Sequence, residues 1–180
     1  MADRGMLRAA QALDGAGFQV VRFNFPYREK SLRRPDPMPT LKASISEAVV
    51  RARAQLEPRR LVIGGRSMGG RAASMLAADG FDCDGLVLLA YPLHPAGKPD
   101  ELRDAHLAQI RVPVLCLNGT RDELCRRDLM EKALDGLSWQ MHWLDGADHS
   151  FHVLKSSGRT DDDVFREVTE VSRAWLSQLN

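Results

Sequence analysis

Cysteines are scarce in this sequence, and it contains no long apolar run. Its 180 residues include three cysteines, and no two of them form a Cys-x-x-Cys pair (Cys83, Cys116 and Cys125). An odd number of dispersed cysteines indicates reduced thiols rather than a disulfide framework or a zinc site. No stretch approaches the roughly 20 apolar residues that span a bilayer, and residues 1–7 lack the apolar core of a secretion signal. We therefore expect a cytoplasmic protein with no membrane partner.

The sequence also lacks an excess of charge of either sign. It contains 25 Lys+Arg and 24 Asp+Glu, a formal net charge of +1, which creates no field that would attract nucleic acid. Both common nucleotide-binding motifs are missing, since there is neither GxGxxG nor Gly-Lys followed by Ser or Thr. A hydrophobic content of 44% and a charged content of 27% are ordinary for a folded chain. We predict a single domain over residues 1–180, with no cofactor and no nucleic-acid partner.

Apolar periodicity alternates between strand-like and helix-like segments along the whole chain. Five short apolar runs predict strands at residues 18–23, 61–63, 86–90, 112–117 and 139–144. Helical spacing lies between these runs, with Asp3 and Thr40 placed to cap the first two helices and Thr160 with Asp163 to cap the last. Strands that are apolar on both faces and alternate with helices are typical of an open parallel sheet. This predicts an α/β fold, in which a mostly parallel sheet of about five strands carries helices on both faces.

A glycine-rich motif stands between a predicted strand and a predicted helix. Residues 65–69 read Gly-Arg-Ser-Met-Gly, a GxSxG sequence, with an apolar run before it and an alanine-rich run after it. That context is typical of a nucleophile elbow, where a serine occupies a pinched strand-to-helix turn. Positions two before and two after the serine leave almost no room for a Cβ, a demand that Gly65 and Gly69 meet. Ser67 is therefore the candidate nucleophile, and the backbone N–H of Met68 is the candidate oxyanion donor.

A serine nucleophile needs a base, and the base needs a carboxylate that orients it. Asp122 follows the predicted strand at 112–117, and His149 follows the predicted strand at 139–144. Because the carboxyl ends of parallel strands meet at one edge of a sheet, both side chains are expected near Ser67. The order serine, acid, histidine also matches the order that this architecture uses. We predict Ser67, Asp122 and His149 as the catalytic residues.

Other reactive side chains have plainer interpretations. His94 follows the strand at 86–90 and is interpreted as a solvated loop histidine, while Cys125 is interpreted as a packing residue. His149 and His152 are three residues apart, but no matching cluster of acids and histidines accompanies them. No metal site is therefore predicted.

Four segments together resemble the α/β-hydrolase superfamily. They are Gly64-Gly65-Arg66-Ser67-Met68-Gly69-Gly70-Arg71, Arg22-Phe23-Asn24-Phe25-Pro26-Tyr27, Asn118-Gly119-Thr120-Arg121-Asp122 and Asp148-His149-Ser150-Phe151. The branch that the chain resembles is the small, lidless one near dienelactone hydrolases, which includes the testis-expressed and NSL-complex-subunit hydrolase-like proteins. The resemblance implies Ser67 as nucleophile, Asp122 as acid and His149 as base. It implies no particular substrate.

The chain departs from this family pattern where it begins. Such hydrolases place a strand and a His-Gly-rich loop before the helix with which this chain starts, and that loop donates the second oxyanion N–H. We therefore expect an N-terminally truncated α/β-hydrolase core. The strand that is lacking normally lies between those at 18–23 and 61–63, so we predict either a slipped five-stranded sheet or a homodimer across the exposed edge. One lost donor costs about 10²–10³ in kcat, and Asn24 or the Phe25 amide is the candidate replacement.

The segment after the third predicted strand leaves no room for a lid domain. Residues 91–99 separate that strand from the next helical segment, and an open site suits small, water-soluble esters or lactones better than lipids. The side chains expected to contact the substrate are Asn24, Phe25, Arg66 and Tyr91. We predict a serine hydrolase that cleaves small-molecule carboxylic esters through an acyl-enzyme. The alternative is a catalytically impaired interaction module that keeps the elbow for folding.

Overall fold

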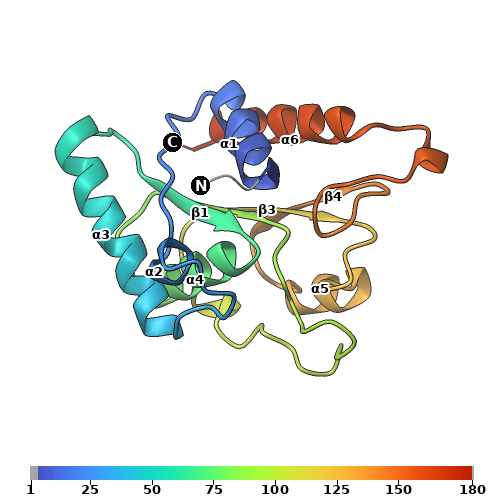
Figure 1. Ribbon diagram of the computed structural model, residues 1–180, viewed down its shortest axis with the longest axis horizontal. Coiled ribbons are helices and arrows are strands. Elements are labelled where there is room, and N and C mark those ends of the chain that lie inside the picture. The colour runs from blue at the N-terminus through green and yellow to red at the C-terminus, as the bar shows by residue number, and fades with distance from the viewer. Residues whose placement is uncertain (1–3, 180) are drawn as a thin grey trace.

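The computed structural model describes residues 4–179, which form one four-stranded parallel sheet (Figure 1). The strands lie in the order β1-β2-β3-β4, and their bounds are Val62–Arg66, Gly85–Leu89, Val114–Gly119 and Trp139–Leu144. The strand order follows the chain, because each crossover returns the chain to the neighbouring position in the sheet. The register places Ile63 opposite Leu86 and Leu88 opposite Cys116. Asp3, the expected first cap, lies outside the described residues.

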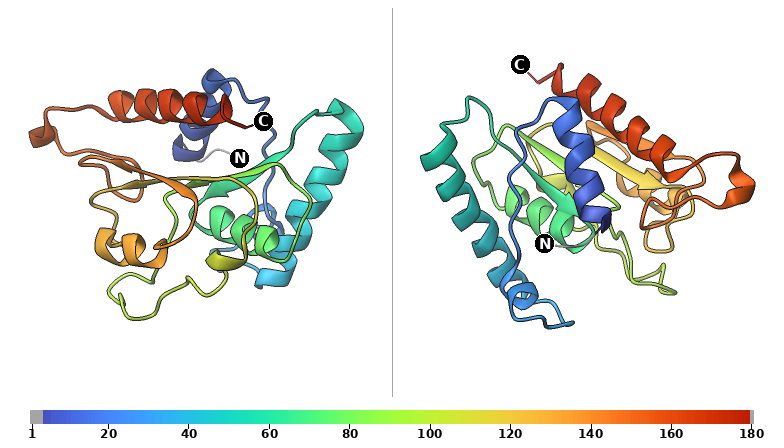
Figure 2. Two further views of the ribbon diagram at one scale, coloured as in Figure 1. Left: turned by 180° about the vertical axis from the view of Figure 1, so that it is seen from behind. Right: turned by 45° about the horizontal axis from the view of Figure 1, so that its top comes forward.

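Helices cover both faces of the sheet (Figures 1 and 2). Helices α1 (Arg4–Ala16) and α6 (Asp161–Leu176) lie side by side on one face, whereas α3 (Met38–Leu56), α4 (Met68–Ala78) and α5 (Arg127–Ala133) lie on the other. The one-turn helix α2 (Pro26–Glu29) and the 3₁₀ turns η1 (Leu107–Gln109) and η2 (Lys155–Ser157) lie in connecting segments. Each face has its own apolar core, one against α4 and one against α6. The predicted α/β class with helices on both faces is confirmed.

The two central strands are the most buried part of the chain. Every residue of β2 and of β3 is buried, because both faces are covered by helices and both edges by neighbouring strands. This explains why both strands carry continuous apolar runs, at residues 86–89 and 114–117. None of the helices formed by residues 4–179 combines the length and the apolar character that crossing a bilayer requires.

The predicted strand at residues 18–23 does not form, so the sheet has four strands rather than about five. The segment is extended, but the backbone N–H and C=O groups of residues 19–24 have no backbone partner in the described part of the chain. A strand exists only through its ladder of hydrogen bonds, and no strand of residues 4–179 pairs with this segment. The expectation of a slipped sheet that closes over this edge is therefore wrong. A homodimer across the edge stays a prediction.

Of the N-caps predicted for α3 and α6, one is wrong and one is confirmed. Helix α3 begins at Met38 with Pro37 as its N-cap, so Thr40 lies inside the first turn and caps nothing. In α6, the Thr160 hydroxyl accepts the Asp163 N–H at 3.2 Å, and the Asp163 carboxylate accepts the Thr160 N–H at 2.9 Å. The predicted capping box of α6 is confirmed, while the predicted cap of α3 is wrong because the proline residues start that helix earlier.

Candidate active site

Ser67 joins β1 to α4 through a strained turn. Its backbone has φ 52° and ψ −119°, which L-residues other than glycine rarely adopt. The Ser67 N–H donates to the Leu89 carbonyl at 2.9 Å and so ties the turn to β2. A Cβ on Gly65 would lie 2.8 Å from the Gly69 carbonyl carbon, and a Cβ on Gly70 would lie 2.7 Å from the Gly65 carbonyl oxygen. The turn closes only because positions 65 and 70 carry no side chain.

The first turn of α4 faces the same site. Met68 is the first residue of the helix, and a backbone N–H at that position has no acceptor within its own helix. Its N–H is therefore available to a developing negative charge at the end of β1. Gly69 has more room than the sequence analysis expected, since the nearest atom to a Cβ there is a Phe25 ring carbon at 3.9 Å. The prediction of crowding at Gly69 is wrong, and the crowded position is Gly70.

Three side chains from the ends of three strands form one hydrogen-bonded chain. The His149 Nε2 lies 2.8 Å from the Ser67 Oγ, and the His149 Nδ1 lies 3.0 and 2.9 Å from the two carboxylate oxygens of Asp122. An ionised carboxylate only accepts hydrogen bonds, so Nδ1 carries the proton and donates it to Asp122. Nε2 then accepts the Ser67 hydroxyl proton. The imidazole is thus placed to remove a proton from Ser67.

Asp122 is held in place by groups that the sequence analysis did not identify. Its side chain is fully buried, and its two oxygens accept the Leu124 N–H at 2.8 Å and the Asn118 amide at 3.3 Å. The buried Asn118 amide also donates to the Tyr91 carbonyl at 3.0 Å and accepts the Tyr91 N–H at 2.9 Å. Asn118 therefore links the acid loop to the end of β2. The sequence signal for this role of Asn118 is an asparagine inside an apolar strand, because a buried amide must find hydrogen-bond partners.

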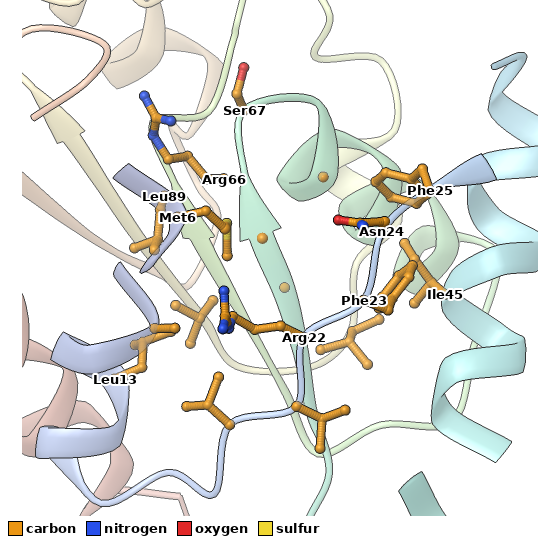
Figure 3. A pocket seen from close by; sticks show the side chains of 18 of the residues that line it. Met6, Leu13, Arg22, Phe23, Asn24, Phe25, Ile45, Arg66, Ser67 and Leu89 are labelled. Atoms are coloured by element: carbon orange, nitrogen blue, oxygen red, sulfur yellow. The ribbon is translucent and has the colours of Figure 1, made fainter. Parts of the chain in front are cut away.

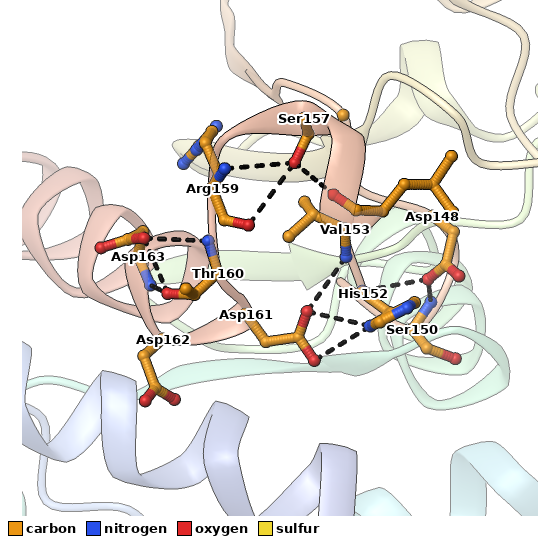
Figure 4. Close-up of polar contacts among 12 residues, drawn as sticks. Asp148, Ser150, His152, Val153, Ser157, Arg159, Thr160, Asp161, Asp162 and Asp163 are labelled. Carbon is orange, nitrogen blue, oxygen red and sulfur yellow. Dashed lines mark hydrogen bonds and ion pairs between the residues drawn. The ribbon is translucent and has the colours of Figure 1, made fainter.

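The loop that carries His149 is fastened on both sides (Figure 4). Asp148 accepts the Ser150 N–H at 2.7 Å and the His152 N–H at 3.1 Å. At the start of α6, the Asp161 carboxylate accepts the Val153 N–H and the His152 Nδ1, each at 3.0 Å. Burial by itself would raise the pKa of Asp161. These hydrogen bonds lower that pKa by more than burial raises it, so it lies below the ordinary value. The position of His149 thus depends on the N-terminus of α6.

A cavity of about 480 Å³ lies beside β1, and Ser67 is among the residues that line it (Figure 3). Its walls come from β1, α1, α3 and the extended segment at residues 18–25. Three of the four predicted substrate-contacting residues line it together with Ser67, namely Asn24, Phe25 and Arg66. Their contact with a substrate stays a prediction.

Two of these three residues have structural partners as well. The Arg66 Nη2 donates to the His149 carbonyl at 2.8 Å and so helps to hold the histidine loop. The Asn24 amide donates to the Glu29 carboxylate at 2.6 Å. One of the two N–H groups of the Asn24 amide is therefore engaged, and its role as the replacement oxyanion donor stays a prediction.

Tyr91 was predicted to contact the substrate, and the structure contradicts this. The residue is fully buried, and its hydroxyl donates to the Arg103 carbonyl at 2.8 Å. The chain turns inward at Ala90, which has a positive φ of 49°. Tyr91 therefore enters the core beside α4 instead of the cavity.

The remaining reactive side chains are part of the packing. His94 is buried rather than solvated, and its Nε2 accepts the Arg126 N–H at 3.1 Å. Cys125 is buried as predicted, and burial raises the pKa of its thiol, which disfavours a thiolate nucleophile. Among residues 4–179, no group of three or more histidine, cysteine or acidic side chains is arranged to hold a metal ion.

Comparisons with known proteins agree with this fold. A family model described as an alpha/beta hydrolase domain matches residues 1–177. An alpha-beta serine hydrolase homologue from Coxiella burnetii is 21% identical, and the match covers 95% of this chain and 77% of that one at a TM-score of 0.74. A protein from Xanthomonas campestris, described as an a/b serine hydrolase without lid, is 24% identical, with 97% and 75% covered at a TM-score of 0.74. A putative alpha/beta hydrolase from Agrobacterium tumefaciens is 18% identical, with 99% and 80% covered at a TM-score of 0.74.

Proposed function

The chain belongs to the alpha/beta hydrolase domain family, and from this membership we propose that it is a serine hydrolase that cleaves carboxylic esters through an acyl-enzyme. The observation that carries the proposal is the unbroken hydrogen-bonded chain from the Ser67 hydroxyl through His149 to the buried Asp122 carboxylate. A serine hydroxyl is a weak nucleophile unless a positioned base takes its proton. Here the base, His149, contacts both the Ser67 hydroxyl and the Asp122 carboxylate that orients the imidazole.

In the first half of the proposed reaction, the Ser67 Oγ attacks the ester carbonyl carbon while His149 Nε2 takes the hydroxyl proton. Asp122 keeps the imidazole in the required tautomer and stabilises its positive charge. The Met68 N–H donates to the oxyanion that forms on the carbonyl oxygen. When the carbon–oxygen bond to the alcohol breaks, His149 returns the proton to the leaving alcohol, and the acyl group stays on Ser67.

In the second half, water takes the place of the alcohol. His149 removes a proton from the water, the resulting hydroxide attacks the acyl carbon, and the bond to the Ser67 Oγ breaks. The proton on His149 returns to Ser67 and the acid product leaves. Each step uses the same three side chains, and the Met68 N–H donates to the oxyanion in both halves.

The surroundings of Ser67 favour esters that reach the site from water. Between β2 and η1 the described chain forms no helix that could cover the site. We therefore assign small, water-soluble esters or lactones as the substrate class rather than lipids held in a covered tunnel.

The test is labelling with a fluorophosphonate together with turnover of p-nitrophenyl acetate. We expect the wild-type chain to be labelled and active, and Ser67→Ala to lose the label and about 10⁶ in kcat. Asp122→Asn should keep the fold but lose about 10⁴ in kcat, because the imidazole loses the partner that fixes its tautomer. Ser44→Ala is the matched control, since Ser44 is a half-buried serine on α3 whose hydroxyl donates to the Thr40 carbonyl of its own helix. Labelling that persists in Ser67→Ala, or a folded wild-type chain that is neither labelled nor active, would reject the proposal in favour of an interaction module.

A further inference from the structure

We propose that Asn118 is a positioning residue of the reaction, whose side-chain amide fixes the Asp122 carboxylate and thereby sets the rate at which His149 activates Ser67. The proposal rests on the proposed function, because Asn118 can change the rate only through the chain from Asp122 to Ser67. It goes beyond that function by adding a fourth, fully buried residue that acts through the acid.

Asn118 lies where the backbone ladder between β2 and β3 comes to an end. The last rung at this end is the Ala90 N–H, which donates to the Leu117 carbonyl at 2.8 Å. Two residues further along, where the same ladder would continue, the chain has Pro92, which has no N–H to donate. The next connection between the ends of the two strands therefore comes from a side chain.

The Asn118 amide makes that connection. Its Oδ1 accepts the Tyr91 N–H at 2.9 Å, and its Nδ2 donates to the Tyr91 carbonyl at 3.0 Å. Oδ1 also accepts the thiol of the buried Cys116, with 3.4 Å between sulfur and oxygen. Donor and acceptor bonds to one backbone residue fix the plane of the amide, and an ionised carboxylate could not make both. Asn118 is thus anchored to the end of β2.

The anchored amide holds one oxygen of the catalytic acid. Its Nδ2 also donates to the Asp122 Oδ2 at 3.3 Å, while the Leu124 N–H donates to Oδ1 at 2.8 Å. Each carboxylate oxygen therefore has a donor of its own in addition to the His149 Nδ1. The carboxylate cannot turn about its Cβ–Cγ bond without losing one of these hydrogen bonds. Asn118 and Leu124 together keep both oxygens beside the imidazole.

The same anchor reaches the nucleophile. The Ser67 N–H donates to the Leu89 carbonyl at 2.9 Å. Ala90 follows with a positive φ of 49° and is fully buried, and Tyr91 then makes both bonds to Asn118. The three residues from Leu89 to Tyr91 therefore connect the turn of Ser67 to the residue that holds Asp122. His149 has to bridge these two side chains, so the spacing that Asn118 maintains matters to the reaction.

Burial makes the position of the carboxylate sensitive to Asn118. Asn118 is fully buried, and the Asp122 side chain has no exposed surface. A side chain of similar outline without a donor would therefore leave Oδ2 without its partner and without water to replace it. A hydrogen bond to a charged group corresponds to a factor of about 10 to 100. A loss of that size is expected in the rate when the amide is removed.

The test is a double-mutant cycle of wild type, Asn118→Leu, Asp122→Ala and the double variant. It is measured as kcat/KM for p-nitrophenyl acetate and as the rate of fluorophosphonate labelling. Leucine keeps the branched outline of asparagine but has neither donor nor acceptor. We expect Asn118→Leu to lower both rates by about 10- to 100-fold in the wild-type background. In the Asp122→Ala background it should lower them by less than about twofold, because no carboxylate is left to position.

The second comparison is measurable, because loss of the acid alone leaves a rate about 10² above that of Ser67→Ala. Asn118→Ser, whose side chain is one bond shorter and does not reach Asp122, is carried through the same cycle with the same expectation. It keeps the test decisive if the leucine variant does not fold.

Leu115→Ala is the matched control for lost stability. Leu115 is a fully buried residue of the same strand, but it belongs to the core beneath α6. This variant should lower the midpoint of urea unfolding and change kcat/KM by less than about twofold in either background. Urea unfolding of every variant separates a change of rate from a change of stability.

The outcomes separate this proposal from the proposed function. Equal losses from Asn118→Leu in the two backgrounds would show that Asn118 acts on the fold and not through Asp122. They would overturn the positioning role and leave the serine hydrolase intact, as would a loss below about twofold in the wild-type background. A folded wild-type chain that is neither labelled nor active would overturn both.

Discussion

The strain at Ser67 has a clear origin in its neighbours. Holding a residue other than glycine in a sparsely populated backbone conformation costs about 1–3 kcal/mol. The hydrogen bond from the Ser67 N–H to Leu89 and the tight contact between Gly65 and Gly70 hold the turn in this conformation. The result is an Oγ that stands within 2.8 Å of the His149 Nε2. The strained backbone of Ser67 therefore fixes the position of its Oγ.

A methyl group at Gly65 tests this interpretation. We expect Gly65→Ala to lower the free energy of unfolding by about 1–3 kcal/mol, because its Cβ would overlap the backbone of Gly69 and Gly70. Gly15→Ala is the matched control, since Gly15 lies exposed in α1 and the nearest atom to its Cβ is 3.5 Å away. That variant should lose nothing and gain up to about 1 kcal/mol. Urea unfolding followed by circular dichroism measures both, and equal stabilities would contradict the crowding argument.

Among the structural elements, α6 has a second role beyond covering the sheet. Its first residues form a capping box, and its Asp161 fastens the loop that carries His149. Fraying of this helix would therefore loosen the histidine as well as the core. The N-terminus of α6 couples local helix stability to the geometry of the site.

Removing the cap of α6 has a predictable cost. We expect Thr160→Ala to lower the free energy of unfolding by about 1 kcal/mol, because the N–H of Asp163 loses its acceptor. Thr40→Ala is the matched control on α3, where the threonine is exposed and caps nothing, and its stability should not change. The midpoint of urea unfolding distinguishes the two, and a comparable loss in both variants would show that the capping box is unimportant.

The segment at residues 18–23 shows how an element depends on a partner. It alternates Phe18, Val20 and Arg22 with Gln19, Val21 and Phe23, and this apolar content favours a strand. No strand pairs with it in the described chain, so its backbone stays without a ladder. Propensity describes the segment, but a hydrogen-bonded neighbour decides whether it becomes a strand.

The stability of the whole molecule should fall in acid because of α6. Burial by itself would raise the pKa values of Asp161 and Glu167, but their hydrogen bonds lower them by more, so both pKa values lie below the ordinary value. A hydrogen bond from Thr160 lowers the pKa of Asp163. A carboxyl whose pKa is lower in the folded chain stabilises the fold above its unfolded pKa of about 4. This contribution is lost as the pH falls below that value and through the lowered pKa of the folded state.

We therefore expect the Tm to change little from pH 7 to pH 5 and to drop between pH 4 and pH 2. Asp161→Asn should have a lower Tm at pH 7 and a smaller drop in acid, because it has already lost that ionised group. Asp135→Asn, at an exposed carboxylate, should follow the wild-type profile. Differential scanning calorimetry across this pH range provides the measurement, and an Asp161→Asn profile parallel to wild type would show that α6 is not responsible.

The sequence by itself determined the features that depend on neighbours along the chain. The GxSxG turn, the capping box of Thr160 and the buried character of β2 and β3 each follow from residues within one short stretch. The positions of Ser67, Asp122 and His149 just after three of the strands were sufficient to place them at one sheet edge, because parallel strands all end there.

Only the tertiary structure decided the features that depend on which distant segments come together. It left residues 18–23 without a ladder, turned Tyr91 into the core, placed Asn118 behind Asp122 and opened the cavity beside β1. The physical reason is that hydrogen bonding and burial are properties of pairs of segments. The sequence gives each residue its hydrogen-bonding groups and its apolar surface. Which of the possible contacts form depends on which segments the folded chain brings together.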